Sequence, residues 1–169
     1  RGIHVVSAWS TMNKLVLGQL KVDEKSNEIT AIPKLLDLLD LKGCTVTIDA
    51  MGAQKKIVKK IVDGGADYVI GLKGNQGNLH EDVKLFIDDQ LKDKITDKTY
   101  QTMQTTDSDH GRIETRTFHL FNDVSWLTQA PDWKGLAGVG AVDSLVEKNG
   151  KISTERRYFI TSHQDMKKF

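Results

Sequence analysis

The amino-acid sequence predicts a mixed α/β fold, and three observations support this prediction. Apolar residues recur at helical spacing in three segments, short apolar runs of strand length lie between those segments, and the second half of the chain alternates in the manner of antiparallel strands. An order of helix, strand, helix, strand implies that the two strands pair in parallel. We therefore expect a mixed sheet flanked by helices and followed by a strand-rich part.

The first half of the chain supplies the helices and the parallel strands. The predicted elements are strands at residues 3–10 and 15–22, a helix at 32–41 with Pro33 in its first turn, a buried strand at 44–48, a helix at 57–62, a buried strand at 68–72 and a helix at 79–91. We expect the first two strands to form a hairpin. We also expect the strand at 44–48 to lie in the same mixed sheet and to run parallel to the first strand.

The second half of the chain has a different character. A polar surface segment at 92–98 leads into predicted strands at 100–106, 112–121, 138–146 and 152–161, and a hairpin turn joins the last two at Lys148-Asn149-Gly150-Lys151. We expect two parts: a core formed by residues 1–91, and a strand-rich insertion with a return to the core formed by residues 92–169.

Composition places only loose bounds on function. The 169 residues carry a net charge of +1, which neither requires nor excludes a nucleic-acid partner. The single cysteine, Cys44, excludes an internal disulfide and fits a reducing cytosol; we expect it to be buried in the strand at 44–48. No apolar run approaches the roughly 18 residues that span a bilayer. The chain starts in a strand-like run without an initiator methionine, so we expect the gene product to begin upstream.

Asp49 is the strongest candidate for a catalytic or metal-binding residue. It follows the apolar run at 44–48 and precedes a helix, and open α/β sheets bind ligands at this end of their strands. An aspartate there can equally be the N-cap of the following helix, and the pattern alone does not separate the two interpretations. If Asp49 is a ligand, its carboxylate should be exposed in a shallow cleft.

Four stretches resemble one known family in the same order along the chain. They are LGQLKVDEKSNEITAIPKLLDLLDLKGCTVTIDAMGAQ, IVDGGADYVIGLKGNQGNLHEDV, DSDHGRIETRTF and ERRYFITS. These stretches resemble the ISAs1-type, or H-repeat-associated, transposases of the IS4-like group. The resemblance implies a DDE transposase with a ribonuclease-H-like mixed sheet flanked by helices, and a bacterial cytoplasmic, nucleoid-associated protein whose partners are transposon-end and target DNA.

The resemblance also implies what Asp49 does and what this chain lacks. Asp49 matches the second acidic residue of the catalytic triad, where it is both a catalytic residue and a metal ligand. The first aspartate is expected on a strand before residue 3, and the final glutamate on a helix beyond residue 169. Carboxylates bind the Mg²⁺ or Mn²⁺ that assists phosphodiester cleavage. With one of three ligands, this chain is expected to hold no metal and to be inactive by itself, and a homo-oligomer is possible for the parent.

Two further motifs are candidates for DNA contact. Lys73 and Asn75 lie in a glycine-containing loop that could meet a phosphate, or that could simply be a strand-to-helix turn with a capping asparagine. Arg112 and Arg116 share one strand face with Glu114, either as phosphate contacts or as a solvated row of ion pairs. We interpret Arg156 and Arg157, with Lys151, as a basic edge that protects an edge strand.

Two functional hypotheses of different classes follow. The first is a part of a transposase that cuts and rejoins DNA at the ends of an insertion sequence. The second is a non-catalytic DNA-binding or self-association remnant of a decayed insertion element. An unrelated α/β nuclease is a weaker third hypothesis, because it would share Asp49 but not the long family stretches. An upstream aspartate and a downstream glutamate in the same reading frame would favour the enzyme.

Overall fold

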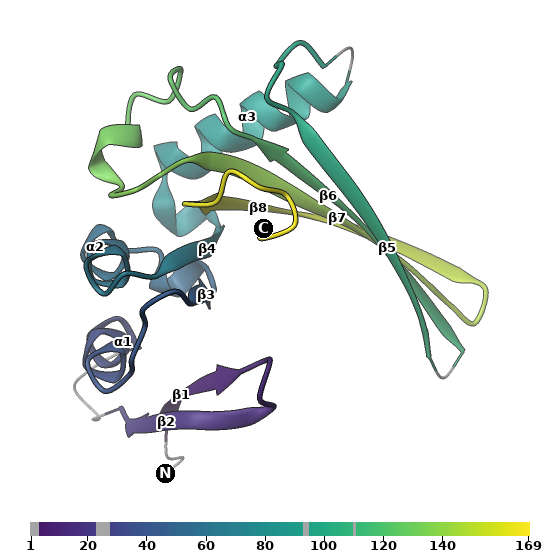
Figure 1. Cartoon of the computed structure of the whole chain (residues 1–169). Helices are drawn as coiled ribbons and strands as arrows, with labels where there is room; N and C mark the ends of the chain where they lie inside the picture. The colour runs from purple at the N-terminus through teal and green to yellow at the C-terminus, as the bar shows by residue number, and fades with distance from the viewer. Residues whose placement is uncertain (1–3, 23–27, 93–94, 110) are drawn as a thin grey trace.

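The computed structural model describes residues 4–22, 28–92, 95–109 and 111–169, which form a mixed α/β structure (Figure 1). The elements are, in chain order, β1 (Val5–Ser10), β2 (Leu15–Lys21), α1 (Glu28–Leu36), β3 (Thr45–Ile48), α2 (Lys55–Asp63), β4 (Asp67–Leu72), α3 (Asn78–Lys92), β5 (Gln101–Asp109), β6 (Arg112–Phe121), β7 (Gly138–Lys148) and β8 (Lys151–Thr161). The predicted fold class of a mixed sheet with flanking helices is therefore confirmed at this level.

Six strands form the main sheet in the order β3-β4-β8-β7-β6-β5. Strands β3 and β4 pair in parallel across the α2 connection, as predicted, and all other neighbours are antiparallel. Strand β8 inserts between β4 and β7, so the end of the chain returns to the centre of the sheet. The outer ends of β5 to β8 extend well beyond the helices as a curled arm (Figure 1).

The N-terminal hairpin forms a sheet of its own. Strands β1 and β2 pair antiparallel, as predicted. The prediction that the strand at 44–48 shares one mixed sheet with β1 and β2 is wrong for this chain, because β1 and β2 form a two-stranded sheet and β3 belongs to the six-stranded one. Helix α1 packs on the hairpin instead: a Cβ at Gly18 would lie 3.2 Å from Leu35 Cδ1. In Figure 1 the hairpin lies apart from β3.

The helices agree with the periodicity in type but not always in extent. Helix α3 buries Leu79, Val83 and Ile87, which lie on the predicted face, and α2 ends at Gly64 as predicted. Helix α1 includes Glu28 and ends at Leu36, so Pro33 lies inside the helix rather than in its first turn. Packing of the buried face of α1 overrides the usual preference of proline for a helix start.

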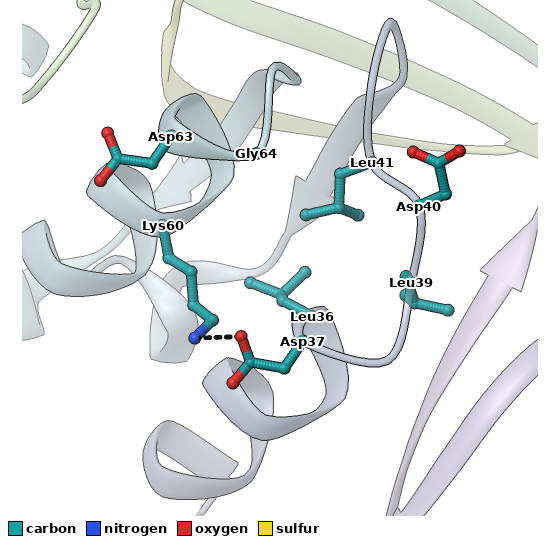
Figure 2. A pocket seen from close by; sticks show the side chains of 8 residues that line it. All are labelled: Leu36, Asp37, Leu39, Asp40, Leu41, Lys60, Asp63 and Gly64. Carbon is teal, nitrogen blue, oxygen red and sulfur yellow. Dashed lines mark ion pairs between the residues drawn. The ribbon is translucent and has the colours of Figure 1, made fainter.

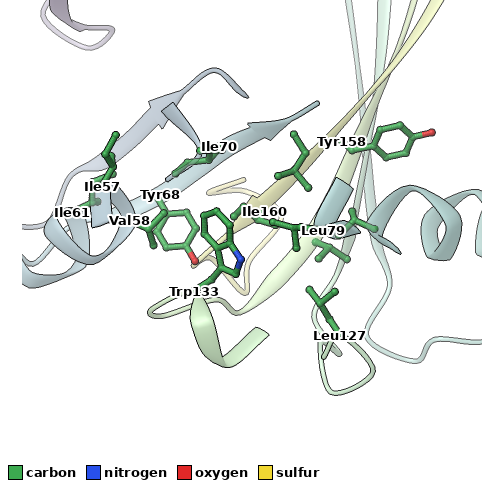
Figure 3. Packing of buried hydrophobic residues seen from close by; sticks show 14 of the residues in the cluster. Ile57, Val58, Ile61, Tyr68, Ile70, Leu79, Leu127, Trp133, Tyr158 and Ile160 are labelled. Atoms are coloured by element: carbon green, nitrogen blue, oxygen red, sulfur yellow. The ribbon is translucent and has the colours of Figure 1, made fainter. Parts of the chain in front are cut away.

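The hydrophobic core lies between the central strands and helices α2 and α3. It joins side chains that are distant in sequence, and Figure 3 shows β4, α2, α3 and β8 contributing Tyr68, Ile61, Leu79 and Ile160, with Trp133 packed beside Tyr68. Strand β3, by contrast, was predicted to be buried, but its residues are alternately exposed and half-buried. Cys44 is exposed, because β3 is an edge strand of this sheet.

The β7–β8 hairpin confirms the predicted turn. Asn149 and Gly150 have φ angles of 51° and 70°, and two successive positive φ values are what a tight hairpin turn requires. Among the described residues, no helix is long and apolar enough to cross a membrane.

Candidate active-site edge

The carboxyl ends of β3 and β4 bring two loops together. Parallel strands end at the same edge of a sheet, so Asp49, which follows β3, and Lys73, which follows β4, lie on one side. The loop after β3 passes beside β4 at Gly71, where a Cβ would lie in ordinary contact, 3.5 Å from the backbone nitrogen of Ala50.

Asp49 is exposed and also caps the turn that follows it. Its Oδ1 accepts a hydrogen bond from the backbone N–H of Met51 at 3.1 Å, at the start of a 3-10 turn over Ala50–Gly52. The amide of Gly52 donates to the backbone carbonyl of Asp49 rather than to its side chain. The second carboxylate oxygen has no hydrogen-bond partner among the described residues. Capping therefore uses one oxygen and leaves the other open to solvent.

The side chain of Ile48 packs tightly against the turn that holds Asp49. A Cβ at Gly52 would lie 2.1 Å from Ile48 Cγ2, so any side chain at this position requires Ile48 or the turn to shift. Ala50 is buried. The turn is therefore stabilised by packing at Gly52 as well as by the hydrogen bond from Met51 to the Asp49 carboxylate.

The loop after β4 reaches across to the loop after β3. Asn75 Nδ2 donates to the backbone carbonyl of Ala50 at 3.0 Å, and Gln76 Nε2 donates to the same oxygen at 2.6 Å. Gln76 Oε1 accepts from the backbone N–H of Lys73 at 2.8 Å. The amide of Asn75 thus faces protein and does not cap α3. Lys73 itself is exposed, with its charge close enough to Glu155 to influence that carboxylate.

The two candidate arginines of β6 form a row of ion pairs. Arg112 and Arg116 flank Glu114 on one face of the strand, as the alternation predicted, and each donates to it at 2.8 Å. Arg116 also contacts Asp107 at 3.2 Å. Strands β4, β8 and β7 lie between β3 and β6, which is roughly 19 Å across the sheet at about 4.8 Å per strand. The structure therefore does not bring these arginines together with Asp49.

A second polar cluster was missed by the sequence analysis. Arg156 lies on the central strand β8, so its interpretation as protection of an edge strand is wrong. Its Nε and Nη2 donate to Asp143 at 2.5 and 2.6 Å, and its Nη1 donates to Asp88 of α3 at 2.9 Å. Strand alternation, which separates Arg156 from Arg157, was the available signal. We call Asp88, Asp143 and Arg156 the arginine clamp.

The arginine clamp borders a hollow of about 510 Å³ on the face of the sheet that carries α3. Burial alone would raise the pKa of Asp88, but hydrogen bonds from Lys84, Tyr158 and Arg156 outweigh it and hold that pKa below its ordinary value. The pKa of Asp143 is likewise lowered, since pairing with Arg156 outweighs burial. Both carboxylates therefore favour the charged form, which pairs with the guanidinium. The ion pair between Arg156 and Asp88 links α3 to the sheet.

A smaller hollow of about 370 Å³ lies between α1 and α2 (Figure 2). It contains three carboxylates, but Asp37 pairs with Lys60 at 2.5 Å, and Asp63 pairs with Lys59 and Lys134. Over the described residues, no group of three or more His, Cys, Asp or Glu side chains is placed to hold a metal ion. Asp49 can thus supply one ligand of a metal site, and the described part of the chain does not supply the rest.

The fold and this edge define an α/β domain with an accessible carboxylate at the carboxyl end of its parallel strands. The transposase DDE domain family matches residues 1–164. The chain therefore belongs to this family, and the resemblance to H-repeat-associated transposases is confirmed. No solved structure matches the chain.

The similar proteins are longer than this chain. The "Uncharacterized protein in dhlA 3'region" of Xanthobacter autotrophicus is 49% identical over 164 residues, covering 96% of this chain and 54% of that protein. The "H repeat-associated putative transposase YhhI" of Escherichia coli (strain K12) is 41% identical over 166 residues, covering 95% and 43%. The "H repeat-associated putative transposase YbfD" of the same strain is 48% identical over 122 residues, covering 72% and 47%. The chain thus spans about half the length of these relatives.

Proposed function

We propose that this chain is part of the catalytic domain of an ISAs1-type, IS4-like transposase that cuts and rejoins DNA at the ends of an insertion sequence. The observation that carries the proposal is the exposed carboxylate of Asp49 at the carboxyl edge of the parallel strands, in a chain that belongs to the transposase DDE domain family. The reaction is hydrolysis of a phosphodiester followed by strand transfer.

Asp49 has the chemistry of one metal ligand. Mg²⁺ and Mn²⁺ prefer carboxylate oxygens, and one oxygen of Asp49 is free of protein hydrogen bonds in the described structure. When bound, the metal activates the attacking oxygen and stabilises the leaving one. Asp49 would hold and orient that ion, while the remaining acidic ligands come from other parts of the parent protein. This chain alone is therefore expected to cut no DNA.

Lys73 is the basic residue best placed to support this chemistry. It is exposed at the same edge as Asp49, and an exposed ammonium there can position a DNA phosphate. Arg112 and Arg116 lie farther out on the arm, where they would contact DNA away from the cleavage point. Both already bind Glu114, so such contacts would exchange one anionic partner for another.

We further infer that the two sheets are parts of one ribonuclease-H-like sheet in the parent protein. The free edge of β3 and the hairpin are separated in the described structure, and Val5, Trp9 and Leu17 of the hairpin are about half exposed. A strand from another part of the parent, placed between β3 and β1, would pair both edges. Amide hydrogen exchange at Thr45 and Thr47 should then be far slower in the complete protein than in this chain.

The test of the function is a plasmid-nicking assay with the complete reading frame and a supercoiled donor carrying the transposon ends. Asp49→Asn should abolish nicking at every Mg²⁺ or Mn²⁺ concentration but leave the gel shift of transposon-end DNA intact. The change removes a charge and keeps the size of the side chain. Asp40→Asn is a matched control, because Asp40 is also exposed and also accepts the amide two residues ahead, at 3.3 Å. Wild-type nicking by Asp49→Asn, or metal-dependent cleavage by the 169-residue chain, would refute the assignment.

A further inference from the structure

Two side-chain amides converge on one backbone oxygen beside Asp49. The carbonyl of Ala50 receives Gln76 Nε2 at 2.6 Å and Asn75 Nδ2 at 3.0 Å, and it also receives the backbone N–H of Ala53 at 3.3 Å. Gln76 is engaged at both ends, since its Oε1 accepts from the backbone of Lys73. Gln76 thus connects the start of its own loop to the residue that follows Asp49.

The Asp49 turn depends on these contacts for its orientation. The turn over Ala50–Gly52 is only three residues long, and its own backbone bonds are those from Gly52 to Asp49 and from Ala53 to Ala50. A single turn of 3-10 helix is weakly stable by itself. The carboxylate direction is set by the bond from Met51 N–H to Oδ1, and the Met51 amide lies inside the turn that Asn75 and Gln76 hold.

We propose that Gln76, assisted by Asn75, is a positioning residue for Asp49. This inference rests on the proposed function and deepens it. Gln76 fixes the Ala50 carbonyl, the carbonyl fixes the turn, and the turn presents the free oxygen of Asp49 in one direction. Catalytic groups must be held within a fraction of an ångström of their working geometry, and supporting residues that touch neither metal nor substrate provide this. The asparagine and glutamine of this loop then act through protein contacts, not through DNA.

The first test uses the 169-residue chain and needs no activity. Gln76→Ala should speed amide exchange at Met51 by roughly threefold to tenfold, as the loss of one hydrogen bond of ordinary strength predicts. Gln76→Glu should do the same, because it keeps an acceptor for the Lys73 amide but loses the donor to Ala50. Gln104→Ala is the matched control, since this glutamine donates only to Thr117 on the arm. Unchanged exchange at Met51 in both Gln76 variants, with exchange elsewhere also unchanged, would overturn the inference.

The second test uses the complete protein in the plasmid-nicking assay. Gln76→Ala should raise the Mg²⁺ concentration for half-maximal nicking several-fold, with the rate at saturating Mg²⁺ largely recovered and the gel shift unchanged. General damage to the fold would instead lower the maximal rate at every concentration, and thermal unfolding of the same variant would show it.

The outcomes separate this inference from the proposed function. A complete wild-type protein that never nicks overturns the function and, with it, the positioning role. A wild type that nicks and an Asp49→Asn variant that does not, together with an unaltered metal dependence in Gln76→Ala, overturns the positioning role alone. Weakened DNA binding by Asn75→Ala or Gln76→Ala at unchanged Met51 exchange would make these residues DNA contacts and would also overturn it.

Discussion

Replacing Arg156 with methionine should destabilise the chain far more than the same change at its neighbour Arg157. Arg156 bonds both carboxylates of the arginine clamp, and the three side chains are each about one third exposed, at 32–34%. Methionine keeps the apolar stem but removes the guanidinium from Asp143, and it leaves Asp88 with Lys84 as its remaining cation. Among the described residues, Arg157, on the opposite face of β8, forms its ion pair with Glu155, and both of those side chains are well exposed.

The magnitude follows from the exposure of the clamp. Stranding a fully buried charge costs about 3–5 kcal/mol, and losing a fully exposed pair costs about 0–1 kcal/mol. A clamp that is one third exposed lies between these limits, so we expect Arg156→Met to cost about 2 kcal/mol. For a chain of this size that lowers the melting temperature by about 4–8 °C. Arg157→Met should change the free energy of unfolding by less than about 1 kcal/mol.

Urea unfolding followed by circular dichroism would measure both variants. A double variant adds a sharper criterion: Asp143→Asn removes one stranded charge, so it should cost less in the Arg156→Met background than in the wild type. The reasoning fails if Arg156→Met is no more destabilising than Arg157→Met. It also fails if Asp143→Asn costs the same in both backgrounds, because Arg156 and Asp143 would then not be coupled electrostatically.

Two further predictions concern the packing of the Asp49 turn and the buried side chain of His119. Gly52→Ala should cost roughly 1–3 kcal/mol in urea unfolding by overpacking Ile48, whereas Gly74→Ala, which meets nothing within 4 Å, should be nearly neutral; equal effects would contradict the packing argument. Burial, partly opposed by the charge of Asp143, lowers the pKa of His119, so the folded state favours the neutral imidazole. Stability should therefore hold above the ordinary histidine pKa of about 6.5 and fall as the pH drops below it, and His119→Gln should flatten this slope in unfolding titrations; an unchanged slope would exclude His119 as its source.

The sequence predicted best those helices and strands that have one buried face and one exposed face, because such elements have a periodic pattern of apolar residues. Helix α3 was predicted well because Val83 and Ile87 recur on a single buried face, and β6 was predicted from Arg112 to Phe121 because its side chains alternate. The start of α1 was missed because a local preference, proline in the first turn, was weighted above tertiary packing. The order of the strands was not predictable from the sequence, since the insertion of β8 between β4 and β7 depends on contacts distant along the chain.

At the candidate site, too, the sequence indicated what depends on a local pattern and missed what depends on contacts between distant residues. Asp49 was singled out because a carboxylate after a short apolar strand is a recognisable local pattern and because the surrounding stretch carries the family resemblance. The function of Gln76 was not found, because its partner, the Ala50 carbonyl, is a backbone atom that carries no sequence signature. Asn75 was singled out, but for DNA contact or for capping, and its amide bonds the Ala50 carbonyl instead. Whether Asp49, Lys73, Arg112 and Arg116 act on DNA remains the prediction made from sequence and resemblance.

The two errors at β3 have a common physical cause. The sequence predicted a buried strand in one sheet with β1, and the structure has an edge strand with exposed Thr45 and Thr47 in a sheet that does not include β1. An exposed edge with unpaired backbone groups and few charges is one that proteins usually cover. The hairpin has a matching free edge, since β1 pairs with β2 alone among the described residues. One additional strand between β3 and β1 would correct both, and it would place its own end next to Asp49, where the proposed metal site needs a second carboxylate.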